Sequence, residues 1–185
     1  MRKPHHVVVA AAGSALLTMA CSAAPSEAQP SETSTASPAD ADALVLALED
    51  EYRAEATYDA VMAAHGEVRP FSNIIQAEQR HSERVRAEMS RLGIEYSDTN
   101  PFIGKITAPT TLLAACQQGV DAETENIALY DEILPTIVDP EVKATLTDLQ
   151  WASRDRHLPA FQRCVDRGGE PGRGMGRGGG YGRGN

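Results

Sequence analysis

The spacing of apolar residues along the middle of the chain predicts helices. Apolar positions recur every three or four residues, and no stretch alternates with the two-residue period of a β-strand. The last helix opens with Asp139 as N-cap and Pro140 at its first position, and Pro159 should bend it just past His157. The predicted helices span about 42–65, 70–93, 110–134 and 139 to near 164.

The lengths of the connections predict how these helices are arranged. Residues 66–69 and 135–138 are short links, so each joins two antiparallel neighbours. The link 93–109 can reach about 50 Å, whereas a helix of about 24 residues is only about 36 Å long. It can therefore cross the whole bundle. We expect an all-α fold over residues 41–167, a ferritin-like four-helix bundle with one long crossover between helices two and three.

The N-terminal segment has the features of an export signal. Arg2 and Lys3 precede an apolar run, 7–20, that is too short to span a bilayer and has the length of a signal-peptide core. The run ends in a sequence that resembles a bacterial lipobox, so residues 1–20 are predicted to be a signal peptide and Cys21 a lipidation site. Ordinary signal cleavage is the alternative. The expected location is extracytoplasmic, as a membrane-anchored lipoprotein or otherwise as a secreted protein.

Two segments have compositions that cannot bury a core. Residues 21–40 are rich in Ser, Ala and Pro and are predicted to be a disordered tether, and 168–185 are a Gly/Arg-rich tail. The remaining length suits one domain. The formal net charge of −9 makes the protein a poor partner for nucleic acid or anionic lipid and a suitable one for cations. We expect metal ions as partners, no nucleic acid, and membrane contact only through the N-terminal lipid.

Several polar residues lie on the apolar stripes of the predicted helices. Burying an unpaired charge is costly, so such groups must be paired, protonated or bound to a metal. Glu78 and His81 form the Glu-x-x-His motif that di-iron carboxylate bundles place on one helical face. Oxygen and imidazole ligands suit iron or manganese. The predicted ligands of one or two such ions are Glu51, Glu78, His81, Glu123 and His157.

Two tyrosines repeat one spacing in both halves of the domain. Tyr58 follows Glu51 by seven residues, and Tyr130 follows Glu123 by seven, so each is expected beside a ligand. Glu55 lies one turn beyond Glu51 and is a candidate additional ligand.

The fourth helix departs from the pattern of a two-metal site. A full site would have a carboxylate three residues before His157, where Arg154 stands, so the second metal position should be the weaker one. The alternative to a metal site is a salt-bridged core, in which the inward glutamates, Glu55 included, pair with Arg154 or Arg156.

Short motifs in all four helices resemble those of a known family. They are Glu51…Ala54…Tyr58, Phe71-Ser72-Asn73-Ile74 leading into Ala77-Glu78-Gln79-Arg80-His81, Gly119…Glu123…Ile127, and Ala152-Ser153 with His157-Leu158-Pro159-Ala160-Phe161. Over 43–167 the chain is similar to the ferritin-like family catalogued as domain of unknown function 2202. The resemblance implies an exported or anchored protein with the same five ligands, and it implies no reaction. Glu55 and Asn126 depart from it, since a basic residue and an aspartate are expected there.

Two classes of function follow from this pattern. The first is a metal-binding bundle with oxidase or peroxide-reactive activity, which needs a carboxylate-bridged metal pair with open positions. The second is a non-catalytic envelope protein, either a metal carrier or a bundle with a salt-bridged core. The sequence leaves open whether the protein is an enzyme.

The positions of two cysteines predict a disulfide. Cys116 lies near the start of helix three and Cys164 near the end of helix four, and antiparallel neighbours bring those ends together. In an oxidising compartment we expect them to be bonded. The alternative is a pair of buried free thiols.

Overall fold

The computed structural model describes residues 36–170, which all belong to one unit, Thr33–Asn185. All regular structure among them is helical, as predicted, and no strand occurs in this part of the chain. None of these helices is both long and apolar enough to cross a membrane. The elements are α1 Pro38–His65, α2 Phe71–Arg91, α3 Leu112–Ile133, η1 Leu134–Thr136, α4 Pro140–Ala152, η2 Ser153–His157 and α5 Leu158–Asp166.

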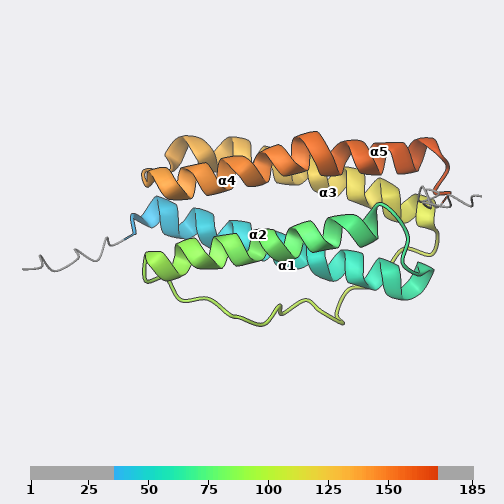
Figure 1. Cartoon of the computed structure of the whole chain (residues 1–185), viewed down its shortest axis with the longest axis horizontal. Helices are drawn as coiled ribbons and strands as arrows, with labels where there is room; N and C mark the ends of the chain where they lie inside the picture. Colours follow the sequence, from blue (N-terminus) through green and yellow to red (C-terminus); the bar gives the residue numbers. More distant parts are fainter. Residues whose placement is uncertain (1–35, 171–185) are drawn as a thin grey trace, which may run out of the picture. The chain divides into compact units, whose positions relative to one another are not determined.

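The last three elements form one continuous rod, because η2 is a single π-helical turn between α4 and α5. The structure therefore has four long helical rods in two hairpins, α1–α2 and α3 with α4–η2–α5 (Figure 1). The connection 92–111 runs along the length of the first hairpin, so α3 starts at the end of the bundle opposite to the end of α2. This is the long crossover expected from the loop lengths.

The apolar core is divided into two clusters along the bundle. One contains Leu44, Leu48, Val85 and Leu146, and the other contains Val61, Phe71, Ile74 and Phe161. Every rod contributes to both clusters, and the polar residues noted in the sequence lie between them in each rod. The bundle thus has a polar layer at mid-length, enclosed by apolar packing at both ends.

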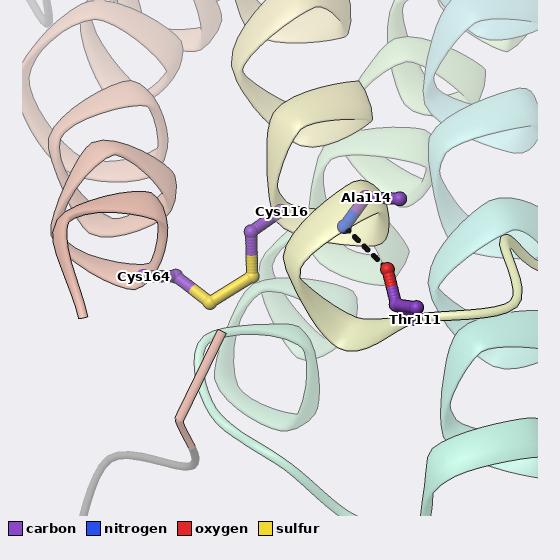
Figure 2. Close-up of a disulfide and its surroundings, with 4 residues drawn as sticks. All are labelled: Thr111, Ala114, Cys116 and Cys164. Carbon is purple, nitrogen blue, oxygen red and sulfur yellow. Dashed lines mark hydrogen bonds between the residues drawn. A yellow bond between two sulfur atoms is a disulfide. The ribbon is translucent and has the colours of Figure 1, made fainter. Parts of the chain in front are cut away.

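A disulfide joins the second hairpin near one end of the bundle. Cys116 of α3 and Cys164 of α5 are bonded, with their Cα atoms 5.9 Å apart, and both residues are fully buried (Figure 2). Close by, the side chain of Thr111 caps α3 by accepting a hydrogen bond from the Ala114 N–H at 3.1 Å. The pairing is the one expected from the helix ends.

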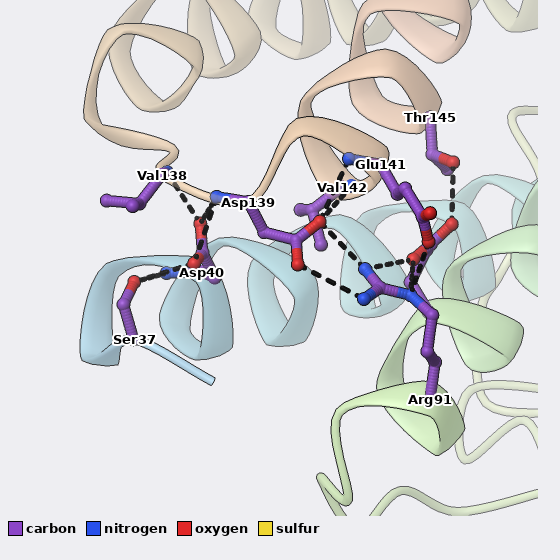
Figure 3. A network of polar contacts seen from close by, with 9 residues as sticks. Ser37, Asp40, Arg91, Val138, Asp139, Glu141, Val142 and Thr145 are labelled. Carbon is purple, nitrogen blue, oxygen red and sulfur yellow. Dashed lines mark hydrogen bonds and ion pairs between the residues drawn. The ribbon is translucent and has the colours of Figure 1, made fainter. Parts of the chain in front are cut away.

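The opposite end of the bundle is fixed by Asp40. This carboxylate is only 2% exposed and accepts hydrogen bonds from the N–H groups of Val138, at 2.9 Å, and Asp139, at 3.3 Å (Figure 3). It therefore ties the start of α1 to the start of α4, in the other hairpin. Ser37 caps α1 by accepting from the Asp40 N–H, and Pro38 follows the cap.

This cap corrects one predicted boundary. Helix α1 begins at Pro38, four residues before the expected start, so 38–40 belong to the bundle and not to the predicted tether 21–40. The apolar periodicity does not reach the first turn of α1, because the buried residue of that turn, Asp40, is polar. The expected signal peptide, Cys21 and nearly all of the tether lie outside the described residues, as does the tail beyond 170.

Arg91 adds a second link at the same end. Its guanidinium bonds Asp139 at 2.8 Å, Glu88 at 2.7 Å and Glu141 at 3.0 Å, and so joins the end of α2 to the start of α4 (Figure 3). Thr145 donates to Glu88 at 3.1 Å within the same group. Both links at this end cross from one hairpin to the other.

The disulfide should contribute substantially to stability, because it closes a loop of 48 residues. The chain-entropy relation gives about 3–4 kcal/mol for a loop of this size. Urea denaturation with and without reductant should show a loss of that order in the free energy of unfolding. The free energy of unfolding of the double variant Cys116→Ala/Cys164→Ala should not change when reductant is added. Alkylation of both cysteines in the unfolded, unreduced protein would contradict the disulfide.

Candidate metal centre

Five side chains meet in the polar layer at mid-bundle. They come from all four rods: Glu51 from α1, Glu78 and His81 from α2, Glu123 from α3, and His157 from η2. None is more than 9% exposed. Three carboxylates at this depth need compensating charge, because desolvating an unpaired carboxylate is prohibitive.

Glu78 is the centre of this group, because its two oxygens face the two imidazoles. Oε2 lies 3.0 Å from Nδ1 of His81, and Oε1 lies 3.1 Å from Nδ1 of His157. On the outer sides, Glu51 lies 3.3 Å from the same nitrogen of His81, and Glu123 lies 3.5 Å from that of His157. The two rings stack with centroids 5.6 Å apart. The result is a row in which three carboxylates alternate with two imidazoles.

Two buried tyrosines hold the outer carboxylates. Tyr130 of α3 donates to Oε1 of Glu51 at 3.1 Å, and Tyr58 of α1 donates to Oε1 of Glu123 at 2.8 Å. Each tyrosine reaches across to the carboxylate of the other hairpin, so the two contacts are reciprocal. Hydrogen bonds of this kind orient ligands and fix their charge distribution. Each tyrosine thus lies beside a predicted ligand, but it bonds the glutamate of the other hairpin and not the one seven residues before it in sequence.

The two histidines are held in their protonated form. Burial lowers the pKa of each imidazole, but the surrounding glutamates together outweigh burial. Glu51 and Glu78 raise the pKa of His81 to about 9, and Glu123 and Glu78 raise that of His157 to about 10.

The pKa values of Glu78 and Glu51 shift in opposite directions, although the two carboxylates lie in the same row. Burial raises the pKa of Glu78, but the nearby imidazoles of His157 and His81 reverse this and lower it to about 2. Burial and the neighbouring charge of Glu78 raise the pKa of Glu51 to about 8, against the opposing effect of His81. Without a metal ion, the row therefore balances its own charge through protons on its histidines and on Glu51.

One nitrogen in the row has no satisfactory partner. Nδ1 of His157 is fully enclosed, and no atom of the described chain meets it in hydrogen-bonding geometry, although carboxylate oxygens of Glu78 and Glu123 lie within 3.5 Å. Buried polar atoms are rarely left in this state. Ligand atoms of Glu78, His81 and His157 all lie within 4.8 Å of one another. These donors fit a divalent cation, and imidazole with carboxylate suits iron or manganese.

Glu55 does not belong to this group, and its prediction as an additional ligand is wrong. Its carboxylate accepts hydrogen bonds from Gln79 at 3.0 Å and from Asn100 at 2.9 Å. Asn100 lies in the crossover and also donates to the Tyr52 carbonyl at 2.7 Å. Glu55 therefore secures the crossover against the first hairpin.

The arginines of the predicted salt-bridged core also lie elsewhere. Arg154 is half-exposed and pairs with Asp131 at 3.4 Å, while Arg156 is exposed and stacks 4.8 Å over Trp151. That form of the alternative is therefore wrong, since the inward glutamates pair with histidines. Within the π-helical turn only Ser153 and His157, four residues apart, are buried, so Ser153 and not Arg154 accompanies His157 on the inner face.

Sequence reasoning missed a polar group next to the row. Ser153 donates to Oδ1 of Asn126 at 2.8 Å, and Asn126 donates to the carboxylate of Asp50. Burial, with added repulsion from Glu123 and Glu78, raises the pKa of Asp50 to about 6, despite the hydrogen bond from Asn126. The spacing along the helix could have revealed this group, because Asn126 lies three residues after Glu123 and so shares its helical face.

Two cavities flank the row on opposite sides. The first, here called the α1/α3 cavity, has a volume of about 270 Å³ and is lined by Glu51, Glu78 and Glu123, among others. The second, the histidine-side cavity, has about 330 Å³ between α2 and the last rod and is lined by His81 and His157. The five side chains of the row are therefore buried but not sealed from small species.

Comparisons with known proteins inform the fold only. No family model and no curated protein matches the chain. A solved structure, that of a hypothetical protein from Methanococcus jannaschii, is similar with a TM-score of 0.62 and 19% sequence identity. The similarity covers 70% of this chain and 81% of that one. At this identity it shows a shared arrangement of helices.

The charge pattern predicts how the metal-free protein responds to pH. The raised pKa values of His81 and His157 give stability that is complete below about pH 6.5 and lost as pH rises through 9 to 10. The raised pKa of Glu51 also makes stability fall as pH rises towards about 8, because the folded state holds a proton on Glu51 that the unfolded state has already lost. We expect the free energy of unfolding to fall by several kcal/mol between pH 6.5 and 10.

Chemical denaturation of chelator-treated protein at several pH values measures this loss. The variant His81→Gln/His157→Gln is the matched control and should show a flatter profile. A wild-type profile that stays level above pH 7 would mean that the histidines are not held protonated.

Proposed function

We propose that this protein is an exported, ferritin-like bundle that binds iron or manganese through Glu51, Glu78, His81, Glu123 and His157. The observation that supports it best is the convergence of both Nδ1 atoms on Glu78, with that of His157 left without a hydrogen bond. The crossover topology and the Glu-x-x-His motif add support. The likeness to domain of unknown function 2202 rests on the sequence motifs alone.

In this proposal each residue has a distinct part. Glu78 lies between the two histidines and is placed to bridge, while Glu51 and Glu123 complete the set on either side. Tyr130 and Tyr58 hold those outer carboxylates in orientation. Bound iron or manganese would supply redox chemistry with oxygen or peroxide, which the protein side chains lack.

The proposed centre is asymmetric. Glu78 and His81 form a carboxylate–imidazole pair on α2, but on the last rod His157 has Ser153 as its inward neighbour, which is a poor ligand. We therefore propose one tightly bound ion and a weaker second position. Arg154→Glu should leave the second position unchanged, because residue 154 pairs with Asp131 outside the core.

The second candidate function is non-catalytic. The metal-free row compensates its own charges through its histidines, which favours a bundle with an ionic core; a metal carrier is the other non-catalytic form. Oxygen consumption on addition of ferrous iron separates an oxidase from a carrier. Metal content of protein purified without chelator separates a carrier from an ionic core.

Export is proposed from the sequence, since Cys21 and the segment before it lie outside the described residues. We expect the mature protein to begin at Cys21 with a diacylglyceryl group, as a lipoprotein. Intact-mass measurement of protein extracted from membranes checks this. A soluble mature form without the added lipid would contradict the anchor and leave secretion as the alternative.

The metal site is tested by comparing two glutamates on neighbouring helices. Glu78→Gln keeps the side-chain shape but removes the central charge, so binding of Fe²⁺ or Mn²⁺ should weaken at least about 100-fold. Glu55→Gln is the matched control and should bind as the wild type does, because Glu55 lies outside the row. Anaerobic calorimetric titration measures both affinities, and circular dichroism checks that both variants fold.

Two outcomes would reject the metal site. One is a wild-type protein that binds neither ion at micromolar concentration. The other is a Glu78→Gln variant that folds and binds as tightly as the wild type. In either case the row would be an ionic core without a metal.

A further inference from the structure

The two cavities beside the row differ in charge. The α1/α3 cavity is bordered by Asp50, Asp121 and Glu125 above the three buried glutamates, with Arg53 as its cation. The histidine-side cavity has no carboxylate in its lining, and its cation is Arg156. A divalent cation approaching the row is therefore attracted on one side and repelled on the other.

The acidic side chains at the mouth of the α1/α3 cavity are available to a cation. Asp121 and Glu125 are exposed, and neither has an ion pair or a side-chain hydrogen bond within the described residues. Arg53, in contrast, is engaged elsewhere, since it bonds Glu49 at 2.6 Å and lies 4.4 Å over the ring of Phe102. The net charge that the mouth presents is negative.

The same cavity leads inward through polar groups. Asp50 stands beside Glu51 and is bonded to Asn126, which is bonded to Ser153, and all of these line the cavity. At its inner end is Glu123, 3.5 Å from the unpartnered Nδ1 of His157. Oxygen atoms therefore line the way from the surface to the ligands, as the hydration shell of a divalent cation requires.

From this difference we propose that the divalent cation reaches its ligands through the α1/α3 cavity, attracted by Asp121 and Glu125 and passed inward along Asp50. The histidine-side cavity is not its route. This inference rests on the proposed metal site and adds to it the path and the residues that make it selective for cations.

Plugging each cavity separately tests the route. Ala54 and Ala77 are both half-buried helical residues, one lining each cavity, so Ala54→Phe and Ala77→Phe form a matched pair. The probe is Co²⁺, whose visible absorption reports ligation, mixed with metal-free protein in a stopped-flow instrument. Ala54→Phe should slow uptake at least tenfold without changing the final occupancy, and Ala77→Phe should stay within twofold of the wild type.

A second plug guards against a folding defect. Ala122 is exposed and lines the same cavity, so Ala122→Phe fills the mouth without disturbing the core. It should slow uptake in the same direction as Ala54→Phe.

The role of charge is tested at the mouth. Asp121→Asn/Glu125→Gln should slow uptake roughly three- to tenfold at low ionic strength, and the difference should shrink as salt is added. Asp59→Asn/Glu67→Gln removes two exposed carboxylates of α1 and its following loop that line neither cavity, and it should have no such effect.

The outcomes separate the route from the site. If Ala54→Phe and Ala122→Phe both take up Co²⁺ at the wild-type rate, the route is overturned while the metal site stands. The same holds if Ala77→Phe slows uptake as much as they do. A wild-type protein that takes up no Co²⁺, Fe²⁺ or Mn²⁺ would overturn the site and the route together. Slowing confined to the α1/α3 variants, with unchanged occupancy, would support the proposal.

Discussion

The burial of Glu78 between two imidazoles is the interaction on which the rest of this structure depends. A carboxylate this deep is tolerable only because His81 and His157 face its two oxygens. Those histidines come from different hairpins, so the same contact also fixes how the hairpins face each other. Glu51 and Glu123 extend the row, and their reciprocal tyrosine contacts cross the same interface. The polar layer is therefore the candidate site, and its contacts also fix how the two hairpins are aligned.

The two ends of the bundle hold this layer in place by different means. At one end Asp40 and Arg91 tie the first hairpin to the start of α4, and at the other the disulfide ties α3 to α5. The apolar clusters fill the space on each side of the row. A row supported in this way keeps its side chains close to one arrangement, which would lower the cost of ordering them around a bound ion.

The asymmetry of the row originates in one turn of helix. In the π-helical segment Ser153–His157 only the first and last residues are buried, so Ser153 and His157 face inward while Arg154 and Arg156 stay outside. Ser153 then bonds Asn126 instead of serving as a carboxylate ligand. Turns of this type are frequent at functional sites, and this one lies in the half of the row that lacks a Glu-x-x-His pair.

The sequence by itself determined the four helices, the two hairpins and the five residues of the row, because apolar periodicity, loop length and polar residues on apolar stripes are local properties of the chain. It also placed Cys116 and Cys164 at helix ends that must meet. Only the tertiary structure decided that Glu55 bonds the crossover, that Arg154 and Arg156 lie outside the core and that two unlike cavities flank the row. A helical projection treats one segment at a time, so it cannot say which neighbour a polar side chain will bond. Those partners are chosen by contacts between helices distant in sequence, which periodicity does not contain.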